Sequence, residues 1–197
     1  MNLENEKVAG LFLFFGTVQY LFTILILAMV EPSYSISTNF ISDLGIGTNA
    51  IVFTVTMVIW GGTAAIAAIF LYRSAATEPF FPLRLLALAL MVGGLGIVGS
   101  GLVPEYSTPG IALHFYLTTV GALSALVAVF LSYKLVNPPF SYVQIFMGGL
   151  ALLTTILLLS GNDLGIGLGG MERMNAYSFI IWLLSLSGAL MNKSQTN

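Results

Sequence analysis

Residues 8–30 read VAGLFLFFGTVQYLFTILILAMV, a hydrophobic stretch without a charged side chain. A helix needs about 20 mostly apolar residues to span the hydrocarbon core of a bilayer. The apolar residues follow one another instead of alternating with polar ones, which indicates a helix and not a strand of a membrane barrel. The stretch therefore predicts a transmembrane helix, and Glu31 and Pro32 mark its end.

Five further stretches of the chain meet the same criterion. They cover residues 49–72, 83–103, 111–133, 141–160 and 175–191. The length of 197 residues suits one domain, so the chain, residues 1–197, is predicted to be one domain. The predicted fold is all-α, an integral membrane bundle of six transmembrane helices.

The composition supports this fold and excludes several functional classes. Hydrophobic residues make up 57% of the chain and charged residues 7%, and the mean hydropathy is +0.97. Soluble domains carry about 25% charged residues. The chain has no cysteine, which excludes disulfides, thiolate metal sites and cysteine nucleophiles. A net charge of -2 provides no basic field for nucleic acid.

The basic residues predict the orientation of the bundle. One falls on one side of the predicted spans, Arg173, and five fall on the other side: Lys7, Arg73, Arg84, Lys134 and Lys193. Because cytoplasmic loops carry an excess of Lys and Arg, both termini are predicted to be cytoplasmic and the protein to lie in the cell membrane. Glu4 and Glu6 outweigh Lys7 ahead of the first span, which is not typical of a secretory signal.

Ionisable residues gather at the predicted outer ends of the helices. Two or three carboxylates with one histidine could hold a divalent cation or provide an acid–base pair. In this hypothesis the candidate catalytic residues are Asp43, His114 and Glu172. The candidate binding residues are Ser42, Glu105, Asp163 and Arg173. Hydroxyl groups could come from Tyr34, Tyr106 and Tyr116.

The same residues also have a structural interpretation. Acidic side chains are favoured at helix N-termini, which fits Asp43 and Glu172. His114 could hydrogen-bond a loop carbonyl, and Arg173 could neutralise a carboxylate such as Asp163. No spacing among these residues is diagnostic of a metal or catalytic site, so the structural interpretation is favoured.

The predicted spans hold no ionisable side chain at mid-depth. Such a group usually marks function, so its absence argues against a proton-coupled transporter. Gln19 is expected to hydrogen-bond across helices, and small residues such as Gly93 and Gly96 predict close helix contacts.

Two outer segments share a short sequence. Residues 43–47 read DLGIG, and residues 163–167 repeat it. An ancient hairpin repeat and a coincidence in a glycine-rich sequence both remain open. The first of these segments also carries apolar residues near helical spacing, which predicts a short helix in the membrane interface.

Three features resemble the membrane family catalogued as domain of unknown function 998. They are the stretch SYSISTNFISDLG at residues 33–45, a histidine that opens the fourth helix (His114), and a Gly-Met-Glu-Arg turn at residues 170–173. The resemblance covers nearly the whole chain and implies a six-helix protein without an assigned activity. A more distant likeness, to the superfamily of alkaline ceramidases and progestin/adiponectin-type receptors, rests on Ser42, Asp43 and His114. The HxxxH pair of that superfamily is missing here.

The residues leave three functional hypotheses open. The first is a scaffold, an accessory subunit or a lipid-interacting protein, because no catalytic motif is present. The second is a membrane-embedded hydrolase or lipid-modifying enzyme with an outer site. The third and weakest is a transporter. No cofactor and no nucleic acid is expected. The lipid bilayer is the predicted partner, and a homo-oligomer or a membrane-complex partner stays open.

Overall fold

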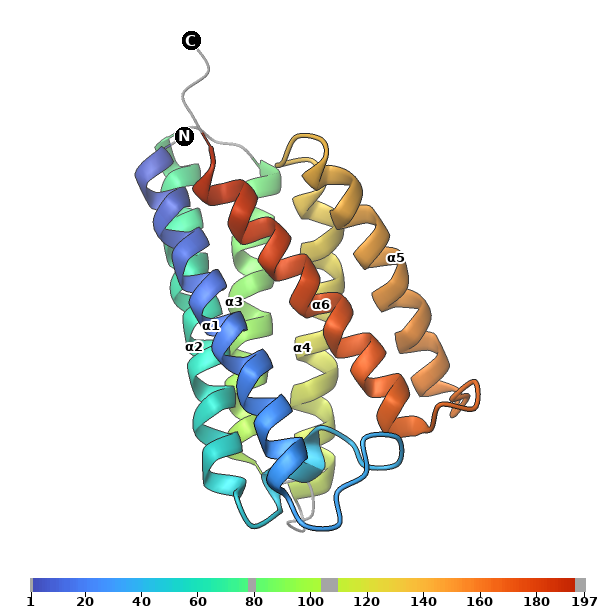
Figure 1. The fold of residues 1–197 in the computed structure, drawn as a ribbon. Helices are drawn as coiled ribbons and strands as arrows, with labels where there is room; N and C mark the ends of the chain where they lie inside the picture. The colour runs from blue at the N-terminus through green and yellow to red at the C-terminus, as the bar shows by residue number, and fades with distance from the viewer. Residues whose placement is uncertain (1, 78–80, 104–109, 194–197) are drawn as a thin grey trace.

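The computed structural model describes residues 2–77, 81–103 and 110–193. These ranges hold six α-helices and one short 3-10 helix, η1 (Figure 1). The elements are, in chain order, α1 (Leu3–Val30), η1 (Ser42–Gly45), α2 (Ala50–Thr77), α3 (Phe81–Leu102), α4 (Gly110–Ser132), α5 (Phe140–Leu159) and α6 (Leu168–Met191). All six α-helices contain a stretch long and apolar enough to cross a membrane, which confirms the predicted all-α class and the six spans.

Two helices, α1 and α6, begin several residues earlier than the hydropathy predicted. α1 begins at Leu3, because the Asn2 side chain accepts hydrogen bonds from the backbone N–H groups of Glu4 (3.1 Å) and Asn5 (3.4 Å). A side-chain acceptor in this position satisfies N–H groups that a helix start leaves without partners. α6 begins at Leu168 and not near residue 175, because its polar first turns bind other parts of the protein.

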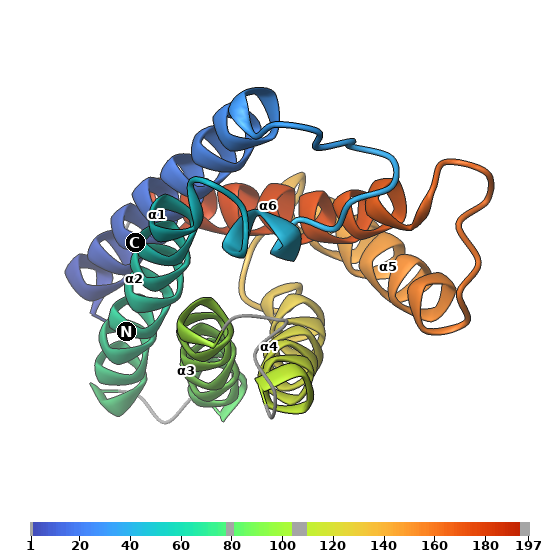
Figure 2. The ribbon, with the colours of Figure 1, turned by 90° about the horizontal axis from the view of Figure 1, so that it is seen from below.

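The six helices pack in the order of the chain. Each helix contacts the next one, and α6 also contacts α1, which closes the bundle. Both termini lie at one end of the bundle (Figure 1). Figure 2 views the bundle from the opposite end, which we call the far end.

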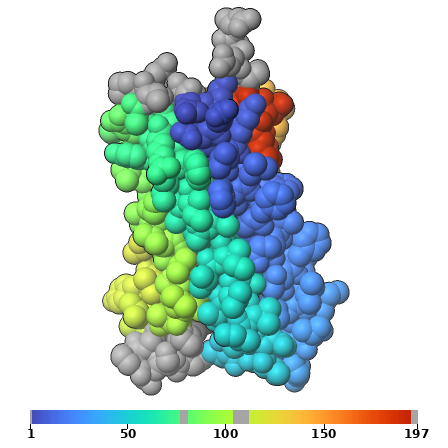
Figure 3. Space-filling view, turned by 90° about the vertical axis from the view of Figure 1, so that its left-hand side faces the viewer, coloured from blue at the N-terminus to red at the C-terminus, as the bar shows by residue number. Residues whose placement is uncertain are grey.

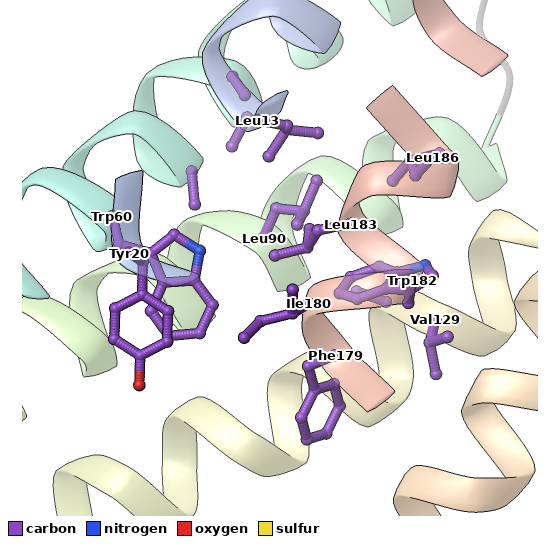
Figure 4. Close-up of a cluster of buried hydrophobic side chains, with 14 of the residues drawn as sticks. Leu13, Tyr20, Trp60, Leu90, Val129, Phe179, Ile180, Trp182, Leu183 and Leu186 are labelled. Carbon is purple, nitrogen blue, oxygen red and sulfur yellow. The ribbon is translucent and has the colours of Figure 1, made fainter. Parts of the chain in front are cut away.

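Large apolar side chains fill the space between the helices (Figure 4). Tyr20 of α1 stacks on Trp60 of α2 with ring centroids 3.9 Å apart, and Trp182 of α6 is almost fully buried. The outward faces also carry large apolar side chains, among them Phe15 and Phe146. Figure 3 shows α1 and α2 side by side along one such face. An apolar exterior of this kind suits contact with lipid chains.

Small residues allow the closest helix contacts, as the sequence predicts. A Cβ atom on Gly61 of α2 would lie 2.3 Å from the carbonyl oxygen of Gly94 in α3. A Cβ atom on Gly96 would lie 2.9 Å from the carbonyl oxygen of Leu117 in α4. Only residues without a side chain permit backbones to approach so closely.

Polar side chains inside the bundle bind across helices. Gln19 of α1 donates to the carbonyl oxygen of Thr56 in α2 at 3.0 Å, which confirms the predicted contact. A second network, which the sequence analysis missed, centres on Gln144 of α5. Its side chain accepts from Ser132 of α4 and donates to Ser185 of α6, each at 3.0 Å. A fully hydrogen-bonded buried network of this kind fixes the relative positions of its helices.

A buried carboxylate joins three elements at the end that holds the termini. Glu6 of α1 has no exposed surface. One of its oxygens lies 2.6 Å from the Lys193 ammonium, beyond α6, and the other accepts from the Ser74 hydroxyl of α2 at 2.9 Å. Local sequence patterns do not reveal this role of Glu6, because Ser74 and Lys193 are distant from it in the chain.

Candidate functional site

At the far end, residues 31–49 connect α1 to α2 and fold back over the bundle. The predicted interfacial helix is present only as η1, a single short turn. An interfacial helix would turn its apolar side chains toward lipid. In the structure, the side chains of Ile41 and Leu44 are instead buried against the protein. This docking places the polar residues of the segment next to the start of α6.

Glu31 ties the two ends of this segment together. Its carboxylate accepts hydrogen bonds from the backbone N–H groups of Thr48 (2.7 Å) and Asn49 (3.3 Å) just ahead of α2. The hydrogen bond from the Thr48 N–H is the main reason that the pKa of Glu31 lies below its ordinary value. A carboxylate in this position satisfies free N–H groups and also gains from the dipole of α2.

Arg173 of α6 holds the middle of the segment. Its side chain is only 6% exposed. One guanidinium nitrogen donates to the carbonyl oxygens of Ile36, Asn39 and Gly169, each at 2.9 Å. The other donates to the hydroxyl of Tyr34. Arg173 is therefore not a free surface charge, as predicted. These four acceptors are uncharged, and the predicted pairing of Arg173 with a carboxylate stays a prediction.

Tyr34 completes this contact from the side of the segment. The Arg173 guanidinium carbon lies 5.3 Å from the centre of the Tyr34 ring, and the Tyr34 hydroxyl donates to the carbonyl oxygen of Phe40 at 2.7 Å. Burial raises the pKa of Tyr34, while the positive charge of Arg173 opposes that rise. The phenol therefore stays neutral near pH 7 and serves both as donor and as acceptor.

Two of the predicted catalytic carboxylates bind the same short stretch. Asp43 accepts from the backbone N–H of Phe40 at 2.9 Å and from the side-chain amide of Asn39 at 3.1 Å. Glu172 accepts from the backbone N–H of Ile41. Ser42 is half-buried at the start of η1. The structure thus brings Ser42, Asp43, Glu172 and Arg173 to one segment.

Glycines at the start of α6 make this docking sterically feasible. A Cβ atom on Gly167 would lie 2.0 Å from the carbonyl oxygen of Ser37, and one on Gly169 would lie 2.2 Å from that of Asn39. The backbone N–H of Gly170 donates to Ser37 at 3.2 Å. Any side chain at the first two positions would displace the segment from α6.

The remaining predicted site residues lie elsewhere. The Nδ1 atom of His114 lies 3.1 Å from the carbonyl oxygen of Ser100 and 2.8 Å from that of Val103, so His114 binds the end of α3. Figure 2 shows the start of α4 well apart from the start of α6. Asp163 accepts the N–H of Gly165 at 2.9 Å within its own turn. Glu105 lies outside the described residues, as does Tyr106.

No group of three His, Asp or Glu side chains within residues 2–77, 81–103 and 110–193 is placed to hold a metal ion. Catalytic and binding roles for the residues named above stay predictions. Their observed contacts are those of structural groups that fix the segment 31–49 on α6.

An apolar cavity of about 360 Å³ lies beneath this segment, and we call it the α1–α6 pocket. α1 supplies six lining residues, the segment 31–49 supplies three, and α6 supplies the two polar ones. The lining residues are Phe22, Ile24, Leu25, Ile26, Ala28, Met29, Ile36, Ile41, Leu44, Arg173 and Tyr177. Hydropathy could not have revealed it, because residues that line a pocket and residues that face lipid are equally apolar.

The family model for proteins of unknown function DUF998 matches residues 14–189, which is most of the chain. The chain belongs to this family. The match includes all of α2 to α5, the segment 31–49 and the start of α6, so the DUF998 region contains the whole candidate site. Comparison of this DUF998 chain with curated proteins and with solved structures finds no match. The comparisons give no support to the more distant likeness to alkaline ceramidases and progestin/adiponectin-type receptors.

Proposed function

We propose that this DUF998 chain is a lipid-interacting membrane protein that holds a hydrocarbon chain in the α1–α6 pocket. The observation that carries the proposal is the pocket itself, which has about 360 Å³ of space and a lining dominated by apolar residues. Ligand pockets typically measure about 300–1,000 Å³, so the space suits one chain or a small apolar group.

The surroundings of the pocket favour a lipid chain as its occupant. Phe22, Ile26 and Met29 line the pocket and are also exposed on the outside of α1. The pocket is therefore continuous with the surface that faces the bilayer. Lipid chains form the medium on that side, and a chain that enters the pocket exchanges one apolar contact for another while it fills empty space.

The polar residues of the pocket suit an amphiphile and not a pure hydrocarbon. Arg173 and Tyr177 line the pocket from the first turns of α6, next to the segment 31–49. An accessory or scaffold protein without a bound lipid would not need this combination of an apolar cavity and a polar rim.

The proposal is tested by filling the pocket. Ala28→Phe places a ring in the cavity, whereas Ala112→Phe adds the same ring to an exposed position of α4. Native mass spectrometry of protein purified in mild detergent should show a retained amphiphile in the wild type and in Ala112→Phe, and several times less in Ala28→Phe. Equal retention in all three proteins, or none in the wild type, would contradict the proposal and favour a scaffold.

We also propose that the far end is the outer face of the cell membrane and that both termini are cytoplasmic. The support is the distribution of basic residues, because five of six lie on the side of the termini. Arg173 is the exception, and its burial among carbonyl oxygens explains why a cation is tolerated there.

A further inference from the structure

The turn between α5 and α6 presents apolar side chains on its outer surface. Leu164 is 66% exposed and Ile166 is 45% exposed, and Leu168 at the start of α6 continues the same apolar surface. The turn carries one charge, Asp163, whose carboxylate is turned back onto the N–H of Gly165. The outward surface of this turn is therefore mainly apolar.

The turn lies at a level where lipid can cover it. α5 has 20 residues, which gives it a length of about 30 Å, the thickness of the hydrocarbon core. A spanning α5 therefore has no residues to spare beyond that thickness, which favours a position of its end at the boundary of the core. Figure 1 shows the turn nearer to the middle of the bundle than the far ends of α1 and α2, and Figure 2 shows it extending sideways from the bundle.

The backbone of the turn holds Leu164 outward. Leu164 has a φ of 51°, a left-handed conformation that side chains with a Cβ atom rarely adopt. The side chain of Asn162 accepts the N–H of Leu164 at 3.1 Å and supports this conformation. An apolar side chain that is both strained and exposed is unfavourable in water, and burial in lipid would offset that disadvantage.

We propose that the turn, residues 161–168, is an interfacial anchor whose Leu164 and Ile166 side chains insert between lipid headgroups and the acyl chains beneath them. Apolar groups buried at this boundary bind the membrane in proportion to their apolar area. The anchor would fix the tilt of α5 and the position of the start of α6. It uses neither the α1–α6 pocket nor the orientation of the bundle, so it stands or fails independently of both.

Single-cysteine labelling tests the anchor directly, because the natural chain has no cysteine. Leu164→Cys and Ile166→Cys carry an environment-sensitive fluorophore, and Thr48→Cys, exposed at the far end beside α2, is the matched control. In liposomes, the labels at 164 and 166 should emit at shorter wavelength than the label at 48. They should be quenched by a headgroup-level nitroxide lipid and severalfold less by aqueous iodide.

The test uses both Leu164→Cys and Ile166→Cys, so that a folding defect in one of them does not decide the result. A melting temperature equal to that of the wild type identifies the folded samples. If the labels at 164 and 166 are as accessible to iodide as the label at 48, and insensitive to the nitroxide lipid, the turn lies in water and the proposal is overturned.

Discussion

Arg173 organises the far end through the geometry of its side chain. A guanidinium presents five donors in a rigid plane, and here two of its nitrogens bind three backbone carbonyls and one phenol from two separate segments. A lysine ammonium carries all its donors on one atom, so it could serve the three carbonyls but not the Tyr34 hydroxyl as well. The residue that opposed the orientation rule in the sequence is thus a central hydrogen-bond donor of the segment 31–49.

Arg173→Ala should lower the free energy of unfolding by about 3 kcal/mol, since each buried carbonyl that loses its donor costs about 1–3 kcal/mol. The free energy of unfolding of Arg173→Lys should lie between those of Arg173→Ala and the wild type. Thermal unfolding in detergent measures both, with the exposed Arg73→Ala as control. Combined with Glu172→Gln, which weakens the same docking, the loss should be smaller than the sum of the two. A melting curve of Arg173→Ala equal to that of Arg73→Ala would refute this role.

Glu31 makes the stability of the far end depend on pH. Its folded-state pKa is lowered, so the carboxylate form stabilises the fold at pH values above the unfolded pKa, about 4.3. That contribution is lost as the pH falls through the lower, folded pKa. We expect the wild type to melt above Glu31→Gln at pH 7 and at pH 5, and the difference to shrink below pH 4. A difference in melting temperature that is constant over this range would show that the charge of Glu31 is irrelevant.

At the scale of elements, hydropathy predicted the apolar spans of the six helices. It missed the polar residues whose structure depends on contacts with distant parts of the chain. It placed the start of the last helix near residue 175, because residues 169–173 include glycines and charges. In the structure this stretch is helical, since Glu172 and Arg173 find partners on the segment 31–49. The network around Gln144 escaped prediction for the same reason, because its partners on α4 and α6 are distant in sequence.

The predicted site was recovered only in part, and the reason is geometric. Asp43 and Glu172 lie 129 positions apart in the numbering, yet they bind neighbouring backbone N–H groups. Their places at the predicted outer ends of the helices suggested that they could meet. His114 lies at the same end of the bundle, but its side chain binds carbonyl oxygens at the end of α3 instead. A list of residues at the same depth gives no information about which helices are neighbours, and neighbouring helices decide whether side chains meet.

The contact between α3 and α4 depends on Gly96. A Cβ atom there would already lie 2.9 Å from a backbone oxygen, so Gly96→Leu should separate the helices and cost about 1–3 kcal/mol, as overpacking does. Gly149→Leu on α5 is the matched control, because a Cβ atom at Gly149 meets nothing within 4 Å. We expect a lower melting temperature for the first variant alone. Equal melting of the two variants would show that the α3–α4 contact tolerates a large side chain.

For the whole molecule, α1 and α6 are joined tightly at one end and frame the α1–α6 pocket at the other. At the end with the termini, a Cβ atom on Gly10 would lie 2.9 Å from the carbonyl oxygen of Ser187, and Glu6 pairs with Lys193. At the far end, the segment 31–49 lies between the two helices, and the pocket lies beneath it. The two helices are thus in direct contact at one end and leave the α1–α6 pocket at the other.

The orientation of this bundle is open to direct measurement. Single cysteines at the exposed positions Thr38 and Thr48 should react with a membrane-impermeant thiol reagent in intact cells, because we place the far end outside. Cysteines at Ala76 and Asn137, exposed at the opposite end, should react only after the cells are permeabilised. The reverse pattern of labelling would place both termini outside.

Photo-crosslinking with a lipid that carries a diazirine near the end of its acyl chain tests the central claim, that the α1–α6 pocket holds a hydrocarbon chain. After reconstitution and irradiation, mass spectrometry locates the labelled residues. Specific occupancy predicts label concentrated on pocket residues such as Ala28, Leu44 and Tyr177, and loss of that label in Ala28→Phe. Label spread over the outward faces of all six helices in proportion to their exposed area, and unchanged in Ala28→Phe, would contradict the claim.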